Sequence, residues 1–461
     1  MESSQSFVGK LKSFFKSENN KKSRLLIAGT DLKFIRPAIK YLEEHFEVKV
    51  DDFSGRLNEN PIREESKELL KWADIVFCEW MESYAVWYSN NISKNQKLFI
   101  RAHKYEIAKL HGHNVNFDNV DGVITINYFL LELFSNMFSI PREKMFYLNN
   151  IIETSIYSSE KQGDYLHNIA LVGSVPRLKG YKRALELLKK LKQSDDKFRL
   201  QVFGKTKKDL KWMNTPVENE YFDDCDRFIE ENSLEDSIIY NGWVERGEMF
   251  NNIGFVLSLS DLEGSHLSPT EAFQASTLSV LRKWPGISYI YPEHLIFDDI
   301  DEMAEFILEL SKDEDEYKRM ATPLRKYCHD SFGEEYFVNN LIRIFNSKTK
   351  SKTLPISLIE FEKNYLDENN NVITDKILND FENSYIVNNK NEIEKIISKN
   401  EKASIFLSNE IDVFEIKDYY ETYKDENTLI YSIYFLEHID EARQFAKAIS
   451  EFQKDENIEI K

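Results

Sequence analysis

Fold class and function both depend on one segment, Asp261-Leu-Glu-Gly-Ser-His-Leu-Ser-Pro-Thr-Glu-Ala-Phe-Gln274. An apolar run at residues 254–259 precedes it and predicts a buried strand. Gly264 marks a turn, and Ser268 and Pro269 then predict a helix start, with Ser as the N-cap and Pro at the first helical position. A strand, a tight loop and a helix N-terminus in succession indicate an α/β unit. Its backbone N–H groups and helix dipole would favour an anion above the edge of the sheet.

Two carboxylates bracket this loop, Glu263 and Glu271, with seven residues between them. Because carboxylates do not bind phosphate, we expect them to accept hydrogen bonds from sugar or ribose hydroxyl groups. An anion site flanked by such acceptors predicts a nucleotide-sugar site. The alternative is an ordinary capped helix, in which Glu271 only closes a capping box with Ser268.

The whole chain has 461 residues, which is enough for two or three domains with cores of their own. No apolar run approaches the ~20 residues that span a bilayer. The net charge of −19 predicts no nucleic-acid partner, because a phosphate backbone would be repelled. The three cysteines are scattered without metal-ligand spacing, and a reduced cytoplasmic compartment fits them best: Cys78, Cys225 and Cys328.

Residues 1–22 form a separate segment with an amphipathic pattern. Lysines fall on one helical face and apolar side chains on the other, namely Phe7, Leu11, Phe14 and Phe15. The pattern is typical of a short helix that lies weakly on a membrane surface. The alternatives are a helix packed on the body of the protein and a frayed end.

Two series of apolar strands alternate with helical patterns, and the polar residues 149–164 between them predict a linker. The first series spans residues 23–150, with strands expected at 23–28, 47–50, 74–78, 97–100, 122–125 and 145–148. The second spans residues 165–348, with strands expected at 168–172, 199–203, 237–240, 254–259 and 277–281. This alternation predicts two Rossmann-like domains with parallel sheets that face a cleft, where ligands usually bind.

The last part of the chain, residues 351–461, has a different composition. It holds 24 acidic and 13 basic residues, a net charge of −11, and no chemical motif. Apolar runs within it are long enough to pack. We therefore expect an acidic, mostly helical accessory region with a strand or two.

A basic, glycine-containing turn follows the first strand of the second series. It contains Gly173, Arg177, Lys179 and Gly180, just before a helical stretch. Cations at a helix start oppose the helix dipole at a cost of about 0.3–1 kcal/mol, which favours a functional role. Arg as a bidentate fork and Lys as a point charge would neutralise a diphosphate. The alternative is a solvated helix start.

Other candidate side chains also follow predicted strands. His103 comes after the fourth strand of the first series and should face the cleft, although a structural role is the alternative. Trp243 and Val244 end another strand and could meet a nucleotide base. We predict no metal site, because His111 and His113 lack a third ligand nearby in the sequence.

Together these motifs resemble retaining GT-B glycosyltransferases of the large family 4 type (glycosyl transferases group 1). Four features carry the resemblance across residues 23–348: the spacing of Glu263 and Glu271, the turn from Gly173 to Gly180, the segment Asn241-Gly242-Trp243-Val244, and His103. Two features depart from the family pattern. A single glycine, Gly29, follows the first strand where a pair is common, and Ser174 stands where an Arg usually follows the first glycine of the turn.

The resemblance implies roles for these residues. Residues 23–150 would form the acceptor domain and residues 165–348 the donor domain. Glu271 would bind the ribose, and Trp243 and Val244 would line the base site. Arg177 and Lys179 would neutralise the diphosphate, and His103 would contact the donor sugar near the reacting carbon. Glu263 would hold the donor sugar and the β-phosphate together with the loop residues Gly264, Ser265, His266, Leu267 and Ser268.

The sequence therefore predicts a retaining hexosyltransferase with a nucleotide-sugar donor, UDP- or GDP-linked, and no cofactor or metal. A carbohydrate or lipid-linked glycan would be the acceptor, and bacterial surface polysaccharide synthesis the setting. The protein would be cytoplasmic or peripheral at the inner face of the membrane. The alternatives are a nucleotide-sugar epimerase or a phosphorylase on the same fold, and a non-catalytic GT-B partner subunit.

Overall fold

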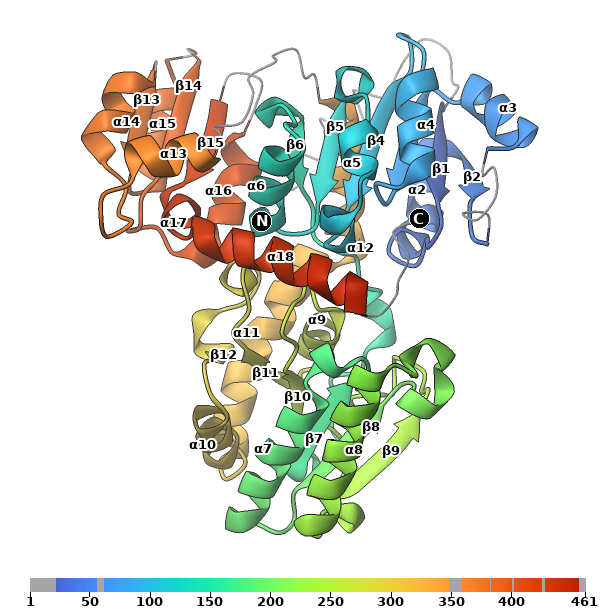
Figure 1. The fold of residues 1–461 in the computed structure, drawn as a ribbon, viewed down its shortest axis with the longest axis vertical. Coiled ribbons are helices and arrows are strands. Elements are labelled where there is room, and N and C mark those ends of the chain that lie inside the picture. The colour runs from blue at the N-terminus through green and yellow to red at the C-terminus, as the bar shows by residue number, and fades with distance from the viewer. Residues whose placement is uncertain are drawn as a thin grey trace.

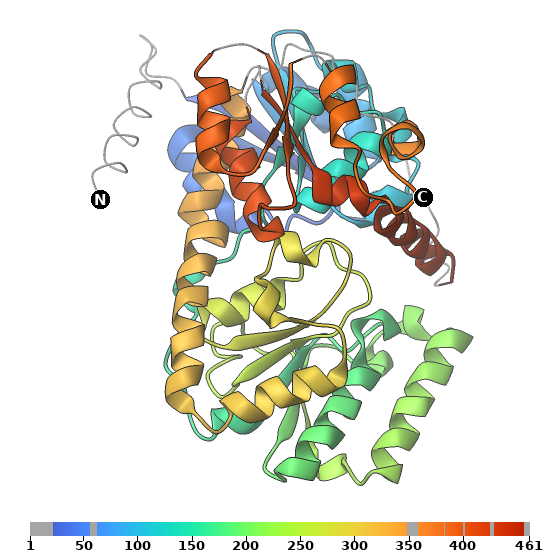
Figure 2. The same cartoon turned by 90° about the vertical axis from the view of Figure 1, so that its left-hand side faces the viewer.

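The computed structural model describes residues 22–55, 62–347, 358–381, 383–399, 402–424 and 428–455. Two α/β domains lie one above the other, and a smaller third unit packs beside the first (Figure 1; Figure 2). None of the helices in these ranges is long and apolar enough to cross a membrane. The predicted amphipathic segment lies outside the described residues, apart from Lys22.

The N-terminal domain contains a parallel sheet of six strands in the order β2-β1-β3-β4-β5-β6. The strands are β1 (Ser23–Gly29), β2 (Phe46–Asp52), β3 (Ile75–Glu79), β4 (Lys97–Ala102), β5 (Gly122–Thr125) and β6 (Met145–Tyr147). The central strands are mostly apolar because helices cover both faces of the sheet. These helices are α2 (Arg36–His45), α3 (Glu64–Trp72), α4 (Ser83–Asn91), α5 (His111–Asn114) and α6 (Tyr128–Met137).

The second domain has another six-stranded sheet, in the order β12-β11-β10-β7-β8-β9. Its strands are β7 (Asn168–Val172), β8 (Arg199–Phe203), β9 (Ile238–Gly242), β10 (Phe255–Ser258), β11 (Leu278–Arg282) and β12 (Ile296–Phe297). The strand order reverses between β7 and β10, and ligands bind at such switch points in open α/β sheets. The domain's helices are α7 (Tyr181–Ser194), α8 (Pro216–Glu231), α9 (Leu267–Gln274), α10 (Ile300–Leu310) and α11 (Glu314–Phe332).

One helix returns from the second domain to the first. Helix α12 (Glu334–Asn346) places Phe337, Leu341 and Phe345 on one face, at a spacing of four residues. These side chains are buried in the same apolar cluster as β1 and α2. The chain therefore ties the two domains together a second time.

The third unit has a parallel sheet of three strands, β13 (Ser384–Val387), β14 (Ala403–Leu407) and β15 (Thr428–Ser432). Helices outweigh strands in this C-terminal region, as predicted, although the sheet has one strand more than the sequence suggested. Its core is continuous with that of the N-terminal domain. The helices are α13 (Leu358–Tyr365), α14 (Thr374–Asp380), α15 (Lys390–Ile397), α16 (Ile416–Tyr423), α17 (Ile433–Glu437) and α18 (Ile439–Asp455).

Helix α18 lies along the junction between the two larger domains (Figure 1). Its buried side chains recur every three or four residues, which is the pattern of one packed helical face: Ala442, Phe445, Ile449 and Phe452. This face packs on α6 and on the 3₁₀ turn η1 (Tyr105–Ala108) of the N-terminal domain. The third unit thus reaches the junction between the two larger domains.

Candidate functional site

Two loops meet at the switch point of the second domain. One leads from β7 through the 3₁₀ turn η6 (Arg177–Lys179) to α7, and the other leads from β10 to α9. Gly180 joins them, because its φ is +75° and a Cβ there would lie 2.3 Å from the carbonyl oxygen of Leu259. The backbone N–H of Asp261 also donates to the carbonyl of Leu178 (2.9 Å). The two segments predicted as a site are therefore parts of one structure.

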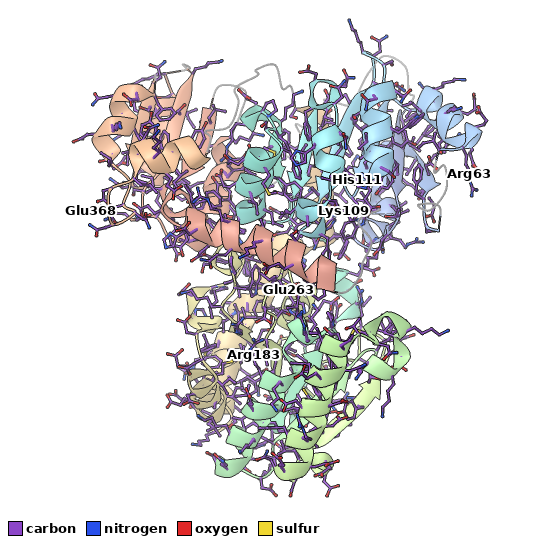
Figure 3. All side chains as sticks on the ribbon, viewed as in Figure 1. Arg63, Lys109, His111, Arg183, Glu263 and Glu368 are labelled. Atoms are coloured by element: carbon purple, nitrogen blue, oxygen red, sulfur yellow. The ribbon has the colours of Figure 1, made fainter. Side chains whose placement is uncertain are left out.

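Glu263 lies at the centre of this structure, where the two domains meet (Figure 3). Its Oε1 is 2.5 Å from Lys179 Nζ of the second domain, and its Oε2 is 3.1 Å from Lys104 Nζ of the N-terminal domain. Burial would raise the pKa of this carboxyl, but the two ammonium groups outweigh burial and hold the pKa well below its ordinary value. The cluster carries one net positive charge.

The N-terminal domain holds the loop that follows Glu263. Lys104 Nζ donates to the carbonyl of Leu262 (2.5 Å), and the Asn127 side-chain amide donates to the carbonyl of Gly264. A Cβ at Gly264 would lie 3.1 Å from Ile126 Cδ1 and 3.2 Å from Lys104 Cβ. Glycine therefore lets the loop approach the opposite domain closely.

The side chain of His266 fixes the conformation of the loop between β10 and α9. Its Nδ1 is 2.7 Å from Ser258 Oγ and its Nε2 is 3.1 Å from Ser268 Oγ. Its carbonyl accepts a hydrogen bond from Tyr291 OH (2.6 Å). Burial, with the nearby charge of Lys179, lowers the pKa of His266 to about 3. His266 is therefore a neutral positioning residue.

The start of α9 differs from the prediction. The helix begins at Leu267, with His266 at the N-cap and no side-chain cap bond. Pro269 is the third helical residue. Backbone N–H groups in the first turn of a helix have no intrahelical acceptor, so the proline costs no hydrogen bond there. Ser268 contacts the imidazole of His266 and not the helix backbone. The Glu271 side chain contacts Arg246 and Tyr157 and not the N-cap backbone, so the predicted capping box does not form.

One hydroxyl group in these loops lacks a hydrogen-bond partner, and one backbone position faces open space. Ser265 Oγ is buried and makes no hydrogen bond within the described part of the chain. Gly173 has φ of +80°, and a Cβ there would meet no described atom within 4 Å. A buried hydroxyl and an approachable backbone at one switch point fit a polar ligand.

Glu271 lies further along α9 and is almost fully buried. Its Oε1 is 3.3 Å from Arg246 Nη1, and it hydrogen-bonds with Tyr157. Burial raises the pKa of Glu271, and Arg246 opposes this shift. Val244 packs in the apolar cluster that includes Tyr157, whereas the neighbouring Trp243 is 80% exposed. The structure thus brings Val244 toward Glu271 and leaves Trp243 on the surface.

Arg177 already has a counter-charge. Its Nε is 3.6 Å from Oε1 of the buried Glu218, whose Oε2 also accepts from the Arg177 backbone N–H (2.9 Å). The guanidinium carbon lies 5.8 Å from the ring centre of Phe452 on α18. Both predicted cations thus pair with a buried carboxylate, and the partner of Lys179, Glu263, is the one that also binds a lysine of the opposite domain.

His103 belongs to the N-terminal domain and directly follows β4. Its Nε2 is 2.6 Å from Oε1 of Glu79, which ends the adjacent strand β3. The imidazole stacks on Trp80, with ring centres 4.0 Å apart, and on Phe34 at 4.9 Å. Glu79 is fully buried and also pairs with Arg101 (3.3 Å). This network fixes the orientation of the imidazole.

Sequence reasoning missed Lys104 and Glu79. Lys104 directly follows His103, and Glu79 directly follows the apolar residues of its strand, so both stood at predicted strand ends. Ligands bind at the carboxyl edge of a parallel sheet, so this rule would have identified both residues as candidates for the site. Within the described residues, no group of three or more His, Cys, Asp or Glu side chains could hold a metal ion.

Comparison with known proteins identifies the type of the second domain. Residues 161–327 match the family model of glycosyl transferases group 1. No curated protein matches the chain. Among solved structures, TarM from S. aureus is 18% identical with a TM-score of 0.47, over 59% of this chain and 55% of TarM. The chain thus spans about half the length of TarM.

Two further structures match over nearly their whole length. HepE from Anabaena, solved in complex with UDP and glucose, is 12% identical with a TM-score of 0.53, over 70% of this chain and 99% of HepE. Sucrose-phosphate synthase from Thermosynechococcus elongatus is 13% identical with a TM-score of 0.53, over 70% of this chain and 98% of the synthase. The fold is therefore GT-B, as predicted. With the group 1 domain, it supports a GT-B glycosyltransferase.

Proposed function

We propose that the protein transfers a sugar from a UDP- or GDP-sugar to a carbohydrate or lipid-linked glycan, with retention of configuration and without a metal. One observation carries this proposal. Lys104 and Lys179, from opposite domains, converge on Glu263 at the switch point of a glycosyl transferases group 1 domain. A cleft site with a net positive charge and a buried carboxylate suits a diphosphate linked to a sugar.

The donor diphosphate would bind beside Lys179 and the N-terminus of α9. The cluster has one positive charge in excess, and the helix dipole adds to it. Ser265 Oγ, which has no hydrogen-bond partner in the described chain, would donate to a phosphate or sugar oxygen. Such fixed charges, shielded from water, would stabilise the negative charge that develops on the departing diphosphate.

The nucleoside would lie toward Glu271. Its carboxylate has Arg246 on one side and would accept hydrogen bonds from the ribose hydroxyls on the other. Val244 and its apolar neighbours would contact the base. A bound ribose would give the buried carboxylate of Glu271 hydrogen-bond partners, although Glu271 does not cap a helix.

The donor sugar would lie between Glu263 and His103. Glu79 occupies Nε2 of His103, so Nδ1 is the ring nitrogen that would face the sugar. By resemblance to retaining enzymes of this fold, the acceptor hydroxyl oxygen would bond to the anomeric carbon on the same face from which the phosphate oxygen departs. The leaving phosphate would take the hydroxyl proton.

The setting we propose is bacterial surface polysaccharide synthesis in the cytoplasm or at the inner membrane face. The amphipathic pattern of residues 1–22 supports it.

A thermal-shift panel of UDP-, GDP- and ADP-sugars tests the function. We expect one nucleotide class to raise the melting temperature, and Lys179→Ala and Glu271→Ala to remove the rise. Lys192→Ala is the control, because Lys192 lies in the last turn of α7 and pairs with exposed Asp196. A wild-type protein that binds none of these ligands would instead point to a non-catalytic subunit.

A further inference from the structure

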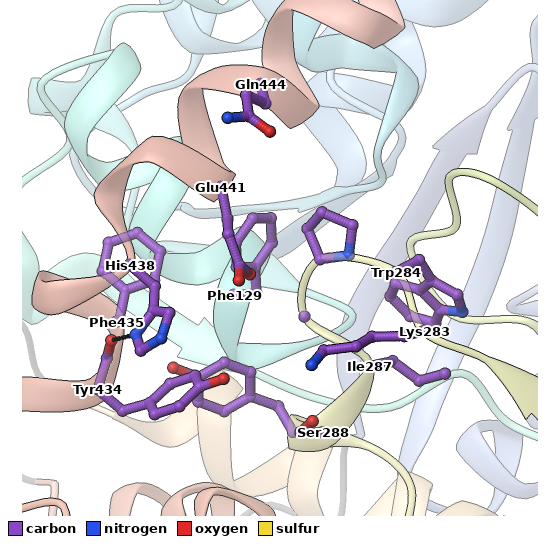
Figure 4. A pocket seen from close by; sticks show the side chains of 13 residues that line it. Phe129, Lys283, Trp284, Ile287, Ser288, Tyr434, Phe435, His438, Glu441 and Gln444 are labelled. Carbon is purple, nitrogen blue, oxygen red and sulfur yellow. Dashed lines mark hydrogen bonds between the residues drawn. The ribbon is translucent and has the colours of Figure 1, made fainter. Parts of the chain in front are cut away.

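A pocket of about 260 Å³, the junction pocket, lies where the three units of the molecule meet (Figure 4). Its walls come from the loop after β11 (residues 283–289), from Phe129 of α6, and from α17 and α18. The loops that carry Glu263 and Lys179 do not line it. The pocket is thus separate from the donor site described above.

Aromatic rings form a large part of the wall. They come from all three units and are Phe129, Trp284, Tyr289, Tyr434, Phe435 and His438. The rings of Tyr434 and His438 stack with centres 4.1 Å apart, and the ring of Tyr289 meets Tyr434 edge-on at 6.2 Å. The pocket therefore offers flat apolar surfaces in a rigid arrangement.

Polar groups of opposite charge complete the lining. Glu441 extends from α18 and Lys283 from the β11 loop, both toward the space between the rings (Figure 4). Gln444 and Ser288 add an amide and a hydroxyl. The ammonium group of Lys283 lies 3.8 Å from Asp298 Oδ1, and its side chain is half exposed, so the ammonium group can turn toward a ligand.

The pocket lies near the loop between β10 and α9, residues 259–266, which we call the donor loop. Strand β11 pairs with β10 in parallel, so the loops after both strands leave the same edge of the sheet about 5 Å apart. Arg282, the last residue of β11, is 3.2 Å from Asp261 Oδ1 in the β10 loop. A ligand chain that begins near Glu263 could therefore continue into the pocket.

The chemistry of the lining matches a sugar ring. A pyranose has a C–H face that packs on aromatic rings, and its hydroxyls both donate to a carboxylate and accept from an ammonium. A lipid chain would leave Lys283 and Glu441 without hydrogen bonds, and a phosphate would be repelled by Glu441. The volume lies just below that of sites for drug-sized ligands, about 300–1,000 Å³, which suits a single ring.

We propose that this pocket binds one sugar ring of the acceptor glycan, away from the reacting hydroxyl, and so selects the acceptor. The proposal rests on the transferase function proposed above. It assigns a role to the third unit, because α17 and α18 supply one wall of the subsite.

Saturation-transfer NMR with maltotetraose, cellotetraose, chitotetraose and α-1,6-mannotetraose tests the proposal on the full chain. Glu441→Trp fills the pocket from α18, and Lys447→Trp makes the same change on that helix outside the pocket, where the side chain is 77% exposed. We expect one glycan to give signals with the wild type and Lys447→Trp, and none with Glu441→Trp. The exposed Lys283→Ala should weaken binding about fivefold without a risk to folding.

Signals that persist in Glu441→Trp, or no signal with any of the four glycans in the wild type, would reject the subsite. Nucleotide-sugar stabilisation is measured on the same samples and should be equal in all variants. Glycan binding without any such stabilisation would reject the transferase function and with it the acceptor role. The two failures are therefore distinguishable.

Discussion

Replacing Glu263 by glutamine should destabilise the free protein and yet raise its affinity for a nucleoside diphosphate. The carboxylate is 8% exposed and lies 2.5 Å from Lys179 and 3.1 Å from Lys104. Glutamine keeps the shape of the side chain and removes its charge. The two ammonium groups are then left without a counter-charge between the domains.

The magnitudes follow from this geometry. Leaving a buried charge unpaired costs about 3–5 kcal/mol, and the lower end applies because Lys179 can still reach water. A phosphate oxygen on the ammonium of Lys179 would lie about 5–6 Å from the carboxylate, where the repulsion of two unit charges is worth roughly 3 kcal/mol at an effective dielectric constant of 20. Movement of the Lys179 ammonium group offsets part of this repulsion, so the gain in binding free energy is smaller. We expect the affinity for UDP or GDP to rise about 10- to 100-fold.

Urea unfolding and isothermal titration calorimetry measure the two effects. The nucleotide-sugar should gain less affinity than the nucleotide alone, because the sugar loses a hydroxyl acceptor, and turnover should fall. Glu82→Gln is the matched control. Its side chain is 9% exposed and pairs with Lys109 at 2.7 Å within the N-terminal domain.

The control should lose stability and keep its nucleotide affinity. If the affinity for UDP and GDP instead fell in Glu263→Gln while the control bound normally, the carboxylate would contribute to nucleotide binding instead of opposing it. The charge argument for this site would then be wrong.

Three further changes probe other parts of the structure. Glu79→Gln should lower the unfolding free energy by about 3 kcal/mol in urea, since Arg101 loses a buried counter-charge, and slow turnover while donor affinity measured by calorimetry stays the same. Gly180→Ala should destabilise by about 2–4 kcal/mol in the same assay, because φ is +75° and a Cβ would meet a backbone carbonyl; an unchanged midpoint would contradict this close approach. Burial raises the pKa of Glu421 to about 7 from an ordinary 4.5, so the stabilisation that Glu421 contributes should fall as pH rises from 4.5 to 7, and the difference in unfolding free energy between the wild type and Glu421→Gln should shrink by that amount over this range.

Local signals were enough to predict most of the fold. Apolar runs bounded by polar turns gave the type and approximate place of the long strands, and their alternation with helices predicted two parallel sheets. Strand β12 was missed because two residues carry no periodicity. The start of α9 was misplaced by two residues, since Pro269 is tolerated throughout the first turn.

Long-range contacts in the site could not be predicted in the same way. The glycines and charges of the second domain stand directly after strands, so their convergence followed from the topology. Lys104 reaches Glu263 across 159 positions of sequence, and Asn127 reaches Gly264 across 137. The apolar spacing along α18 predicts a buried face, but it does not say which domain that face covers.

The packing of the units connects the donor loop with the junction pocket. The N-terminal domain and the third unit share one apolar core, to which the described part of the second domain contributes two buried side chains, Leu262 and Tyr289. Leu262 directly precedes Glu263, and Tyr289 lines the pocket. Burying an apolar side chain of this size is worth about 1.5–3 kcal/mol, so these two residues contribute to holding the second domain on that core. Leu262 and Tyr289 thus anchor the donor loop and the junction pocket on the same apolar core.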